Sequence, residues 1–400
     1  MRAMAFSKTG GPEVLHLVDL PTPTPGPDEI LLRVAYAGVN YGEIQHRLGD
    51  FGEPEGETVT GLEAAGVVAA VGERAPVGER AAADVSGASA ASAAASDVSV
   101  GARAAADGSV GERAAADGSV GARATADRSV GARAAAGVSV GDRVASYLPD
   151  GGGYAEYVVV PAAFAFPLPD ALDLRTGGAA ALVLTTAYGV LAGAARLAPG
   201  DTVLIHAAAG GVGGVAAQLA RALGARAVYG TVSTPEKAAY ARAAFGYDEV
   251  FVRDGFPAAV TAATSGRGVD VVLDPVGGPT RLASLDVLAP FGRVAVYGEA
   301  ARHPDLHLRV LPLWKNNRTL TGYNIGDLAR RAPETLRTHA LNALNLAAEG
   351  AVRLDITEEH DLTEAAKAHR LLGEGRNRGK TVLRVDASAS PSGGAPSGGV

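Results

Sequence analysis

The stretch that decides the fold reads TVLIHAAAGGVGGVAAQLARALGA, from Thr202 to Ala225. An apolar run, Thr202–His206, leads through a turn of small residues into an amphipathic segment, Val212–Leu223, which ends before Gly224. This order predicts a strand followed by a helix. The alternation continues downstream, with expected strands at Ala227–Val232, Val269–Leu273 and Arg293–Tyr297 and an expected helix at Pro235–Phe245. It predicts an α/β fold with a parallel, doubly wound sheet.

The turn after the first strand has the spacing of a dinucleotide-binding turn in which Ala208 takes the first glycine position. Gly210 lets a pyrophosphate approach the backbone, and Gly213 lets the helix pack against the strand. The helix N-terminus supplies free N–H groups and a positive dipole. We therefore expect a cofactor to lie on Ala209, Gly210, Gly211, Val212 and Gly213. The alternative is a tight packing turn without a ligand.

The end of the second strand indicates which cofactor is used. An NAD site places Asp or Glu there to hold the ribose 2′-hydroxyl, whereas this chain has Ser233 followed by Thr234 and Pro235. Ser233, a helix N-terminus and the ammonium of Lys237 together suit a 2′-phosphate, and Arg253 adds a second cation. The sequence predicts NADPH. The alternative for Lys237 is a solvated helix lysine.

Composition narrows the class of protein. The chain has 400 residues, 47% of them hydrophobic, and a formal net charge of −7, which gives no reason to expect nucleic acid or an anionic membrane as partner. It has no cysteine, so disulfides, thiolate zinc sites and thiol nucleophiles are excluded. No apolar run reaches the length of a membrane span, and residues 1–8 lack signal-peptide character. We expect a cytoplasmic protein without a membrane segment.

A ten-residue repeat occupies about residues 73–138. Copies of SVGAR or SVGER begin at Ser99, Ser109, Ser119 and Ser129, and SVGDR begins at Ser139. Each unit carries one large apolar residue, a valine, and buries too little surface to offset its ordering entropy. We interpret the segment as a solvated insertion in a surface loop, with a docking segment as the alternative. Residues 387–400 are expected to form a flexible tail.

Several motifs together resemble one family, the zinc-independent quinone oxidoreductases of the medium-chain dehydrogenase/reductase superfamily. The motifs are GGPEVL (Gly10–Leu15), GVNYGEIQHRLG (Gly38–Gly49), GLEAAGVV (Gly61–Val68), GDRV (Gly141–Val144), HAAAGGVG (His206–Gly213) and DPVGG (Asp274–Gly278). The resemblance implies a Rossmann domain, 164–315, inserted in a GroES-like β-rich catalytic domain, 1–163 and 316–386. It also implies a homodimer formed through the edge of the Rossmann sheet.

The activity that the resemblance implies is hydride transfer from NADPH to a quinone or an activated enone, without a metal. Zinc-dependent relatives carry a cysteine and a Gly-His-Glu, whereas this chain reads Gly61-Leu62-Glu63. Two alternatives stay open. The same fold also serves enoyl-thioester reductases, and the chain is alternatively a sensor that binds NADPH without catalysis.

The resemblance also implies site residues. It places Asn40 and Tyr41 at the cleft as catalytic candidates, with Asn40 bonding the ribose or the acceptor carbonyl and Tyr41 donating a proton or stacking. Thr186 is expected near the nicotinamide, with a hydroxyl bonded to its own helical turn as the alternative. The remaining cofactor candidates are Val276, Gly277, Tyr297, Gly298, Asn377 and Lys380. Glu43 and Arg47 are expected to form a structural pair.

Overall fold

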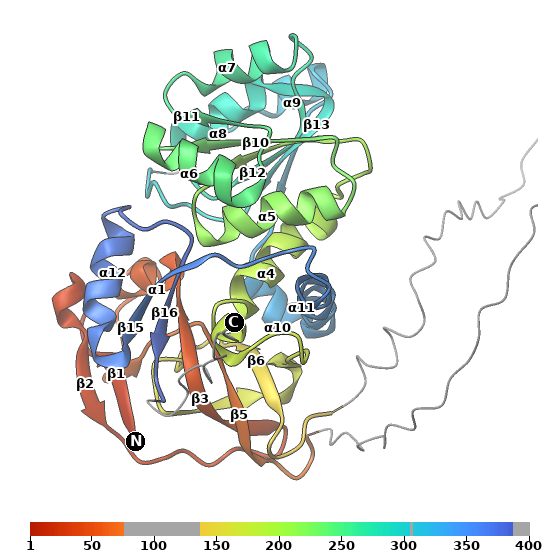
Figure 1. Cartoon of the computed structure of the whole chain (residues 1–400). Coiled ribbons are helices and arrows are strands. Elements are labelled where there is room, and N and C mark those ends of the chain that lie inside the picture. The colour runs from red at the N-terminus through yellow and green to blue at the C-terminus, as the bar shows by residue number, and fades with distance from the viewer. Residues whose placement is uncertain (76–136, 305–306, 387–400) are drawn as a thin grey trace, which may run out of the picture. The chain divides into compact units, whose positions relative to one another are not determined.

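The strand–helix alternation builds a six-stranded sheet, which we describe from a computed structural model covering residues 1–75, 137–304 and 307–386. Most of the predicted insertion, residues 76–136, lies outside the described residues, as does the tail 387–400. All described residues belong to one unit, Met1–Gly78 with Gly137–Val400. The two lobes of this unit are described in turn (Figure 1).

The first lobe carries the parallel sheet, whose strand order is β11-β10-β9-β12-β13-β14. Its strands are β9 (Thr202–His206), β10 (Ala227–Val232), β11 (Glu249–Val252), β12 (Val269–Asp274), β13 (Leu288–Val296) and β14 (Thr319–Gly322). All neighbours pair in parallel. In chain order this is 3-2-1-4-5-6, the arrangement of a dinucleotide-binding fold. The expected strands and the expected helix at 235–245 are confirmed.

Helices cover both faces of this sheet. They are α5 (Gly211–Ala222), α6 (Pro235–Phe245), α7 (Phe256–Ala263), α8 (Gly278–Asp286) and α9 (Val310–Lys315). Val203 and Ile205 of β9 belong to the hydrophobic cluster that includes α5 and α6 side chains, whereas Leu204 belongs to the cluster of α7 and α8. Successive strand residues point to opposite faces. A strand covered on both sides is largely apolar, as the central residues Val203–Ile205 of β9 are, and all of β9 is buried.

The second lobe is rich in antiparallel β-structure. One sheet has the order β15-β16-β3-β5-β6-β8, with β7 paired to β3, and a smaller sheet has the order β2-β1-β4. The strands are β1 (Arg2–Phe6), β2 (His16–Asp19), β3 (Glu29–Val39), β4 (Thr58–Val59), β5 (Glu63–Val71), β6 (Arg143–Tyr147), β7 (Tyr157–Pro161), β8 (Ala165–Pro167), β15 (Ile356–Asp361) and β16 (Lys380–Arg384). Strands from both ends of the chain therefore complete one sheet.

Within the described residues, further helices and helical turns connect and cover the lobes. They are α1 (Tyr41–Arg47), α3 (Leu174–Gly178), α4 (Ala181–Tyr188) continued by a π-helical turn (Gly189–Ala194), α10 (Ile325–Arg331), α11 (Pro333–Ala348) and α12 (Ala365–Gly373). Short 3-10 turns lie at Pro12–Val14, Ala162–Phe164 and Leu362–Glu364. One sequence boundary shifts: β14, which we expected in the catalytic segment 316–386, pairs with β13 in the parallel sheet. Within the described residues no helix is long and apolar enough to cross a membrane.

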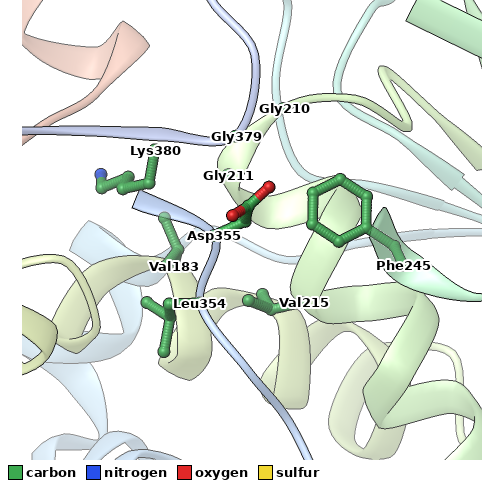
Figure 2. Close-up of a pocket in the computed structure, with 9 residues that line it drawn as sticks. All are labelled: Val183, Gly210, Gly211, Val215, Phe245, Leu354, Asp355, Gly379 and Lys380. Carbon is green, nitrogen blue, oxygen red and sulfur yellow. The ribbon is translucent and has the colours of Figure 1, made fainter. Parts of the chain in front are cut away.

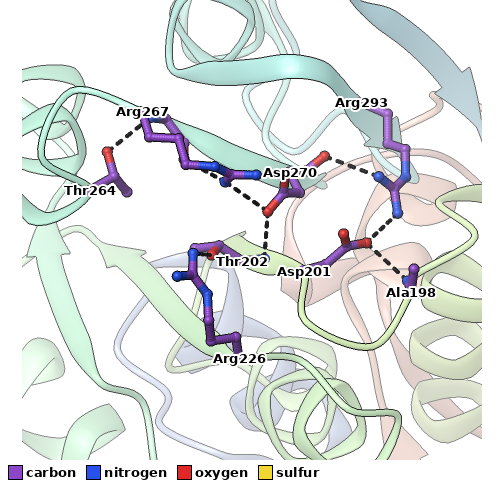
Figure 3. Close-up of polar contacts among 9 residues, drawn as sticks. Ala198, Asp201, Thr202, Arg226, Thr264, Arg267, Asp270 and Arg293 are labelled. Atoms are coloured by element: carbon purple, nitrogen blue, oxygen red, sulfur yellow. Dashed lines mark hydrogen bonds and ion pairs between the residues drawn. The ribbon is translucent and has the colours of Figure 1, made fainter.

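Charged side chains fasten the amino-terminal ends of the parallel strands (Figure 3). The Asp270 carboxylate accepts hydrogen bonds from the Thr202 N–H at 2.8 Å and from Arg267 at 2.7 and 3.0 Å. Arg293 donates to the Asp201 carboxylate at 2.5 Å and to the Asp270 carbonyl. These bonds tie β9, β12 and β13 together at the end of the sheet away from the glycine-rich turn.

Candidate active site

The glycine-rich turn lies where β9 ends and α5 begins, as expected. Gly210 is the residue before the helix, and a Cβ at Gly213 would lie 2.4 Å from the Ala207 carbonyl oxygen, so only glycine allows this close packing. The N–H groups of Gly211, Val212 and Gly213 lie in the first helical turn and have no acceptor four residues back. They are available to phosphate oxygens.

The last loop of the catalytic lobe contacts this turn. The Gly379 N–H donates to the Ala209 carbonyl at 2.9 Å, and Gly210 and Gly379 form an isolated parallel bridge. A small pocket follows between them, lined by Val183, Gly210, Gly211, Val215, Phe245, Leu354, Asp355, Gly379 and Lys380 (Figure 2). In Figure 2 the ammonium of Lys380 points away from the Phe245 side of the pocket. The expected return of this loop to the cofactor turn is thus present in the geometry, and Asn377 lies half-buried just before it.

Three cations gather beyond the end of β10. Thr234 caps α6 by accepting from the Lys237 N–H, and Pro235 starts the helix, as the sequence predicts. Burial, and next the positive charges of Arg378 and Arg253, lower the pKa of Lys237. The Lys237 ammonium donates to the Gly375 carbonyl at 2.5 Å, and the Arg253 Nε is buried without a hydrogen-bond partner.

A carboxylate near these three cations is the exposed Glu236, whose pKa is lowered by its own backbone N–H, by the Thr234 hydroxyl and by the charge of Arg378. In the part of the chain that the structure describes, none of Lys237, Arg253 and Arg378 forms an ion pair with a carboxylate. Lys237 and Arg253 are partly buried and Arg378 is exposed, and like charges gathered in this way are costly unless an anion compensates them. Arg378 was not anticipated from the sequence; the signal was its place one residue before Gly379, in the loop already expected at the cofactor. Ser233 is exposed at the same strand end.

The ends of β12 and β13 complete the carboxyl edge of the sheet. Asp274 accepts from the N–H groups of Val276 and Gly277 at 2.8 and 3.0 Å. Arg281, which the sequence did not single out, donates to Asp274 at 2.7 Å and to the Gly298 carbonyl at 2.9 Å. Val276, Gly277, Tyr297 and Gly298 are thereby fixed along the edge at which ligands bind in open α/β sheets.

The Thr186 hydroxyl is buried and forms no hydrogen bond with the described residues. The Thr186 side chain as a whole is 6% exposed. The neighbouring Thr185 hydroxyl does bond back to its own helix, at the Ala181 carbonyl. The alternative for Thr186, a hydroxyl bonded to its own helical turn, therefore applies to Thr185 and not to Thr186. A buried hydroxyl without a partner carries a desolvation penalty that a bound ligand relieves.

Asn40 precedes α1 and lies in a buried charged network. Its amide nitrogen donates to Glu43 at 3.2 Å and to Glu63 at 3.0 Å, and its carbonyl oxygen accepts from Lys380 at 2.5 Å. The Glu63 carboxylate pairs with the Lys380 ammonium at 2.6 Å. Burial raises the pKa of Glu43 to about 7, although Lys380 and two backbone N–H groups oppose this. Both N–H groups of the Asn40 amide are therefore already engaged.

The expected pair of Glu43 and Arg47 is not formed. Glu43 instead accepts from the backbone N–H groups of Asn40 and Leu62, at 2.7 and 2.9 Å, and so caps the start of α1. Arg47 donates to the Gly10 carbonyl. The two side chains lie four residues apart on one helix, but burial gives the carboxylate better partners in backbone N–H groups.

Tyr41 joins the two lobes. Its hydroxyl donates to the Ala300 carbonyl at 3.2 Å, and nearby the Arg302 guanidinium pairs with Asp50 at 2.6 Å. The phenol therefore lies half-buried between the catalytic lobe and the loop after β13 and is not packed in a core. This arrangement keeps its O–H at the side of the cleft where the strand ends of the parallel sheet lie.

Comparison with known proteins covers the same two lobes. Residues 26–170 match the alcohol dehydrogenase GroES-like domain family, and residues 211–344 match the zinc-binding dehydrogenase family. The chain is 31% identical over 388 residues to a quinone oxidoreductase of Pseudomonas aeruginosa, covering 96% of this chain and 99% of that protein. Over 238 residues it is 35% identical to a highly reducing polyketide synthase of Emericella nidulans, of which it spans 9%.

Solved structures agree with this assignment. The quinone oxidoreductase of Pseudomonas syringae pv. Tomato DC3000 is 31% identical and matches 96% of this chain and 99% of its own, with a TM-score of 0.75. The Escherichia coli quinone oxidoreductase complexed with NADPH is 25% identical and matches 96% of this chain and all of its own, with the same TM-score. Both the sequence motifs and the structure thus show that this chain is an oxidoreductase that belongs to the zinc-independent quinone oxidoreductase family of the medium-chain dehydrogenase/reductase superfamily.

Proposed function

We propose that this NADPH-dependent oxidoreductase reduces a quinone or another activated enone. The choice of NADPH as cofactor rests on the cluster of Lys237, Arg253 and Arg378. These three cations form no ion pair with a carboxylate among the described residues. A 2′-phosphate is a dianion that compensates such a cluster, whereas the neutral 2′-hydroxyl of NADH does not. The relatives complexed with NADPH support the same cofactor.

The residues present fit this cofactor along its whole length. The free N–H groups of Gly211, Val212 and Gly213 suit the pyrophosphate, and the buried Thr186 hydroxyl suits the nicotinamide end. Ala209, Gly210, Ser233, Val276, Gly277, Tyr297, Gly298 and Asn377 line the path between these points. When bound, NADPH supplies the hydride. The overall change is the two-electron reduction of the acceptor with uptake of one proton from solution.

The side chains of the cleft orient the acceptor and exclude water. Both amide N–H groups of Asn40 are engaged, so Asn40 does not donate to the acceptor carbonyl; a contact with a ribose hydroxyl would be made by its carbonyl oxygen, which also faces Lys380 and the Glu43 N–H. Tyr41 has a phenolic proton held by the Ala300 carbonyl, a neutral acceptor that a reduced quinone oxygen outcompetes. Donation from Tyr41 stabilises the negative charge that develops on that oxygen.

Steady-state kinetics with benzoquinone test the proposal. We expect the protein to oxidise NADPH when benzoquinone is present, which is measured as a loss of nicotinamide absorbance. Oxidation of NADH under the same conditions is expected to be slower. The variant Tyr41→Phe is expected to lower kcat about a hundredfold or more, since removal of one donor to a developing oxyanion costs about this much. A wild-type protein that binds NADPH without oxidising it in the presence of any acceptor contradicts the proposal and favours the sensor alternative.

An enoyl thioester is the second candidate acceptor. The identity to polyketide synthases over more than half of the chain favours testing it beside the quinone. Both acceptors need hydride delivery and stabilisation of an oxyanion, so the described cleft does not discriminate between them. A crotonyl thioester as acceptor decides the question: turnover of the thioester without turnover of benzoquinone would replace the leading proposal.

We also propose that the protein forms a homodimer through the edge of the parallel sheet. Among the described residues, strand β14 ends the sheet and pairs on one side, with β13. Next to it in the chain, α9 exposes Val310 by 74% and Trp314 by 71%. Unpaired strand edges and exposed apolar groups favour association. Light scattering should give twice the chain mass for the wild type and the single chain mass for Trp314→Asp.

The location that we propose is the cytoplasm. A sequence with no cysteine needs no oxidising compartment to fold. Cell fractionation with antibodies against the protein tests this, and enrichment outside the cytoplasmic fraction would contradict it.

A further inference from the structure

Lys380 is the first residue of β16 and is engaged entirely within the protein. Its ammonium donates to the Glu63 carboxylate, to the Asn40 carbonyl oxygen and to the Val39 carbonyl, at 2.6, 2.5 and 2.9 Å. An ammonium has three N–H groups, and all three are used. The side chain is 4% exposed. Lys380 therefore has no donor left for a phosphate, although it lies beside the glycine-rich turn.

The position of Lys380 connects the glycine-rich turn to Asn40. A Cβ at Gly211 would lie 3.3 Å from the Lys380 Cδ, so the lysine stem passes directly over the start of α5. The preceding Gly379 N–H is bonded to the Ala209 carbonyl. At its other end the ammonium holds the Asn40 amide. One side chain thus spans the distance from the turn expected at the pyrophosphate to the asparagine expected at the ribose.

Glu63 fixes the same group from the opposite side. It is fully buried and accepts from Lys380, from the Asn40 amide at 3.0 Å and from the Leu182 N–H at 2.7 Å. The site has been shaped around it, since a Cβ at Gly38 would lie 2.1 Å from its carboxylate oxygen. Lys380 of β16, the Leu182 N–H at the start of α4 and the Asn40 amide therefore all meet at the carboxylate of Glu63, which lies on β5.

We propose that Lys380 and Glu63 are positioning residues that hold the Asn40 amide in one orientation, with its N–H groups toward Glu43 and Glu63 and its oxygen toward Lys380, for contact with the cofactor ribose. The proposal rests on the NADPH-dependent hydride transfer proposed above. An amide held by opposite charges on its two ends has one orientation, because a flip would face N–H groups to the ammonium and oxygen to the carboxylates. The sequence alone predicted a direct contact between Lys380 and the cofactor. In this proposal Lys380 acts on the cofactor through Asn40 instead.

The test is a comparison of Lys380→Met/Glu63→Gln with Asn40→Ala and with the triple variant. Removing both charges together avoids leaving one unpaired in the interior. Hydride transfer is measured by stopped flow at saturating NADPH, and NADPH affinity by fluorescence. We expect each variant to slow hydride transfer about tenfold or more, with Kd for NADPH changed less than about threefold, and the triple variant to be no slower than Asn40→Ala.

Lys367→Met is the matched control, since Lys367 is an exposed lysine on α12 whose carboxylate partner among the described residues is Glu364. It should keep the wild-type rate. Thermal melts show whether each variant is folded, and Glu63→Gln alone, which keeps Lys380 near Glu43, serves if the double variant is not; it should slow hydride transfer severalfold with Kd unchanged.

Two results would overturn the inference. One is a rate loss in the triple variant that equals the product of the separate losses, which means that Lys380 and Glu63 act independently of Asn40. The other is a weaker Kd for NADPH with an unchanged saturated rate, as expected of a lysine that touches phosphate. A wild type that transfers no hydride to any acceptor is a different failure: it removes the proposed function itself, and with it the role of positioning.

Discussion

Ala207 is a residue in a conformation that glycine prefers. It follows β9 directly and has a φ of 54°, in the left-handed region, where a Cβ costs about 1–2 kcal/mol. Its carbonyl accepts from the Gly210 N–H and so shapes the glycine-rich turn. The strain therefore lies at the entrance of the expected cofactor site.

Ala207→Gly should raise the free energy of unfolding. The relief of strain exceeds the entropy cost of glycine, for a net gain of about 0.5–1 kcal/mol. Ala209→Gly, two residues on and buried, is the matched control and should destabilise. Urea denaturation of both variants measures this. Equal losses of stability in the two variants would show that residue 207 carries no strain.

His206 shows how burial decides a protonation state. The Ser284 hydroxyl donates to the Thr280 carbonyl, so the His206 Nε2–H must donate to Ser284, at 2.8 Å. The Nδ1 then accepts from the Thr231 hydroxyl at 2.7 Å. A second ring proton would meet this hydroxyl, and burial lowers the pKa of His206 to about 4. The histidine is a buried packing residue in the neutral form.

This histidine predicts a loss of stability in acid. In the unfolded chain His206 takes up a proton below about pH 6.5, whereas in the folded chain it stays neutral to about pH 4. The free energy of unfolding therefore falls as pH falls through this window, by about 2 kcal/mol from this group between about pH 7 and pH 5. Denaturation of His206→Asn should show that much less pH dependence. The same slope in variant and wild type would contradict the assignment.

At the scale of elements, most of the parallel sheet could be predicted from the sequence. Strands β9, β10 and β12 are short continuous apolar runs, and Thr234 with Pro235 marks the start of α6. Strand β14 was assigned to the other lobe because four residues, TLTG, with no buried member carry too weak a pattern to reveal their partner. Its pairing with β13 depends on the register of the whole sheet.

The candidate site was predictable only where the signal is local. The glycine-rich turn and the Lys237 region each lie within one strand–helix unit, so spacing reveals them. The network around Asn40 joins residues 23 and 340 positions away in the sequence. No local pattern reports such a contact, and the sequence therefore paired Glu43 with the neighbouring Arg47.

The charged network at the amino-terminal strand ends should stabilise the folded protein without changing its affinity for NADPH. Asp270→Ala leaves Arg267 and the Thr202 N–H without their acceptor and should lower the free energy of unfolding by about 2–3 kcal/mol. NADPH affinity should not change, because the glycine-rich turn is at the opposite strand ends. Asp286→Ala, which removes an exposed carboxylate 3.5 Å from Arg318, is the control. A weaker Kd for NADPH in Asp270→Ala would contradict this division.

At the scale of the whole molecule, contacts between the lobes cluster at the proposed cofactor path. Tyr41 and Ala300, Asp50 and Arg302, and Gly379 and Ala209 each connect the catalytic lobe to the parallel-sheet lobe. Lys237 donates to the carbonyl of Gly375 in the same last loop. Residues that we propose at the cofactor, among them Tyr41, Lys237 and Ala209, therefore also make contacts between the lobes.

The central claim is that Lys237, Arg253 and Arg378 recognise a 2′-phosphate. The most direct measurement is Kd for NADPH and for NADH, by titration calorimetry, in the wild type and in Lys237→Glu. We predict that the wild type binds NADPH at least about tenfold more tightly than NADH, and that Lys237→Glu removes this preference while leaving Kd for NADH nearly unchanged. Equal affinity of the wild type for the two cofactors, or a preference that survives in Lys237→Glu, would contradict the account.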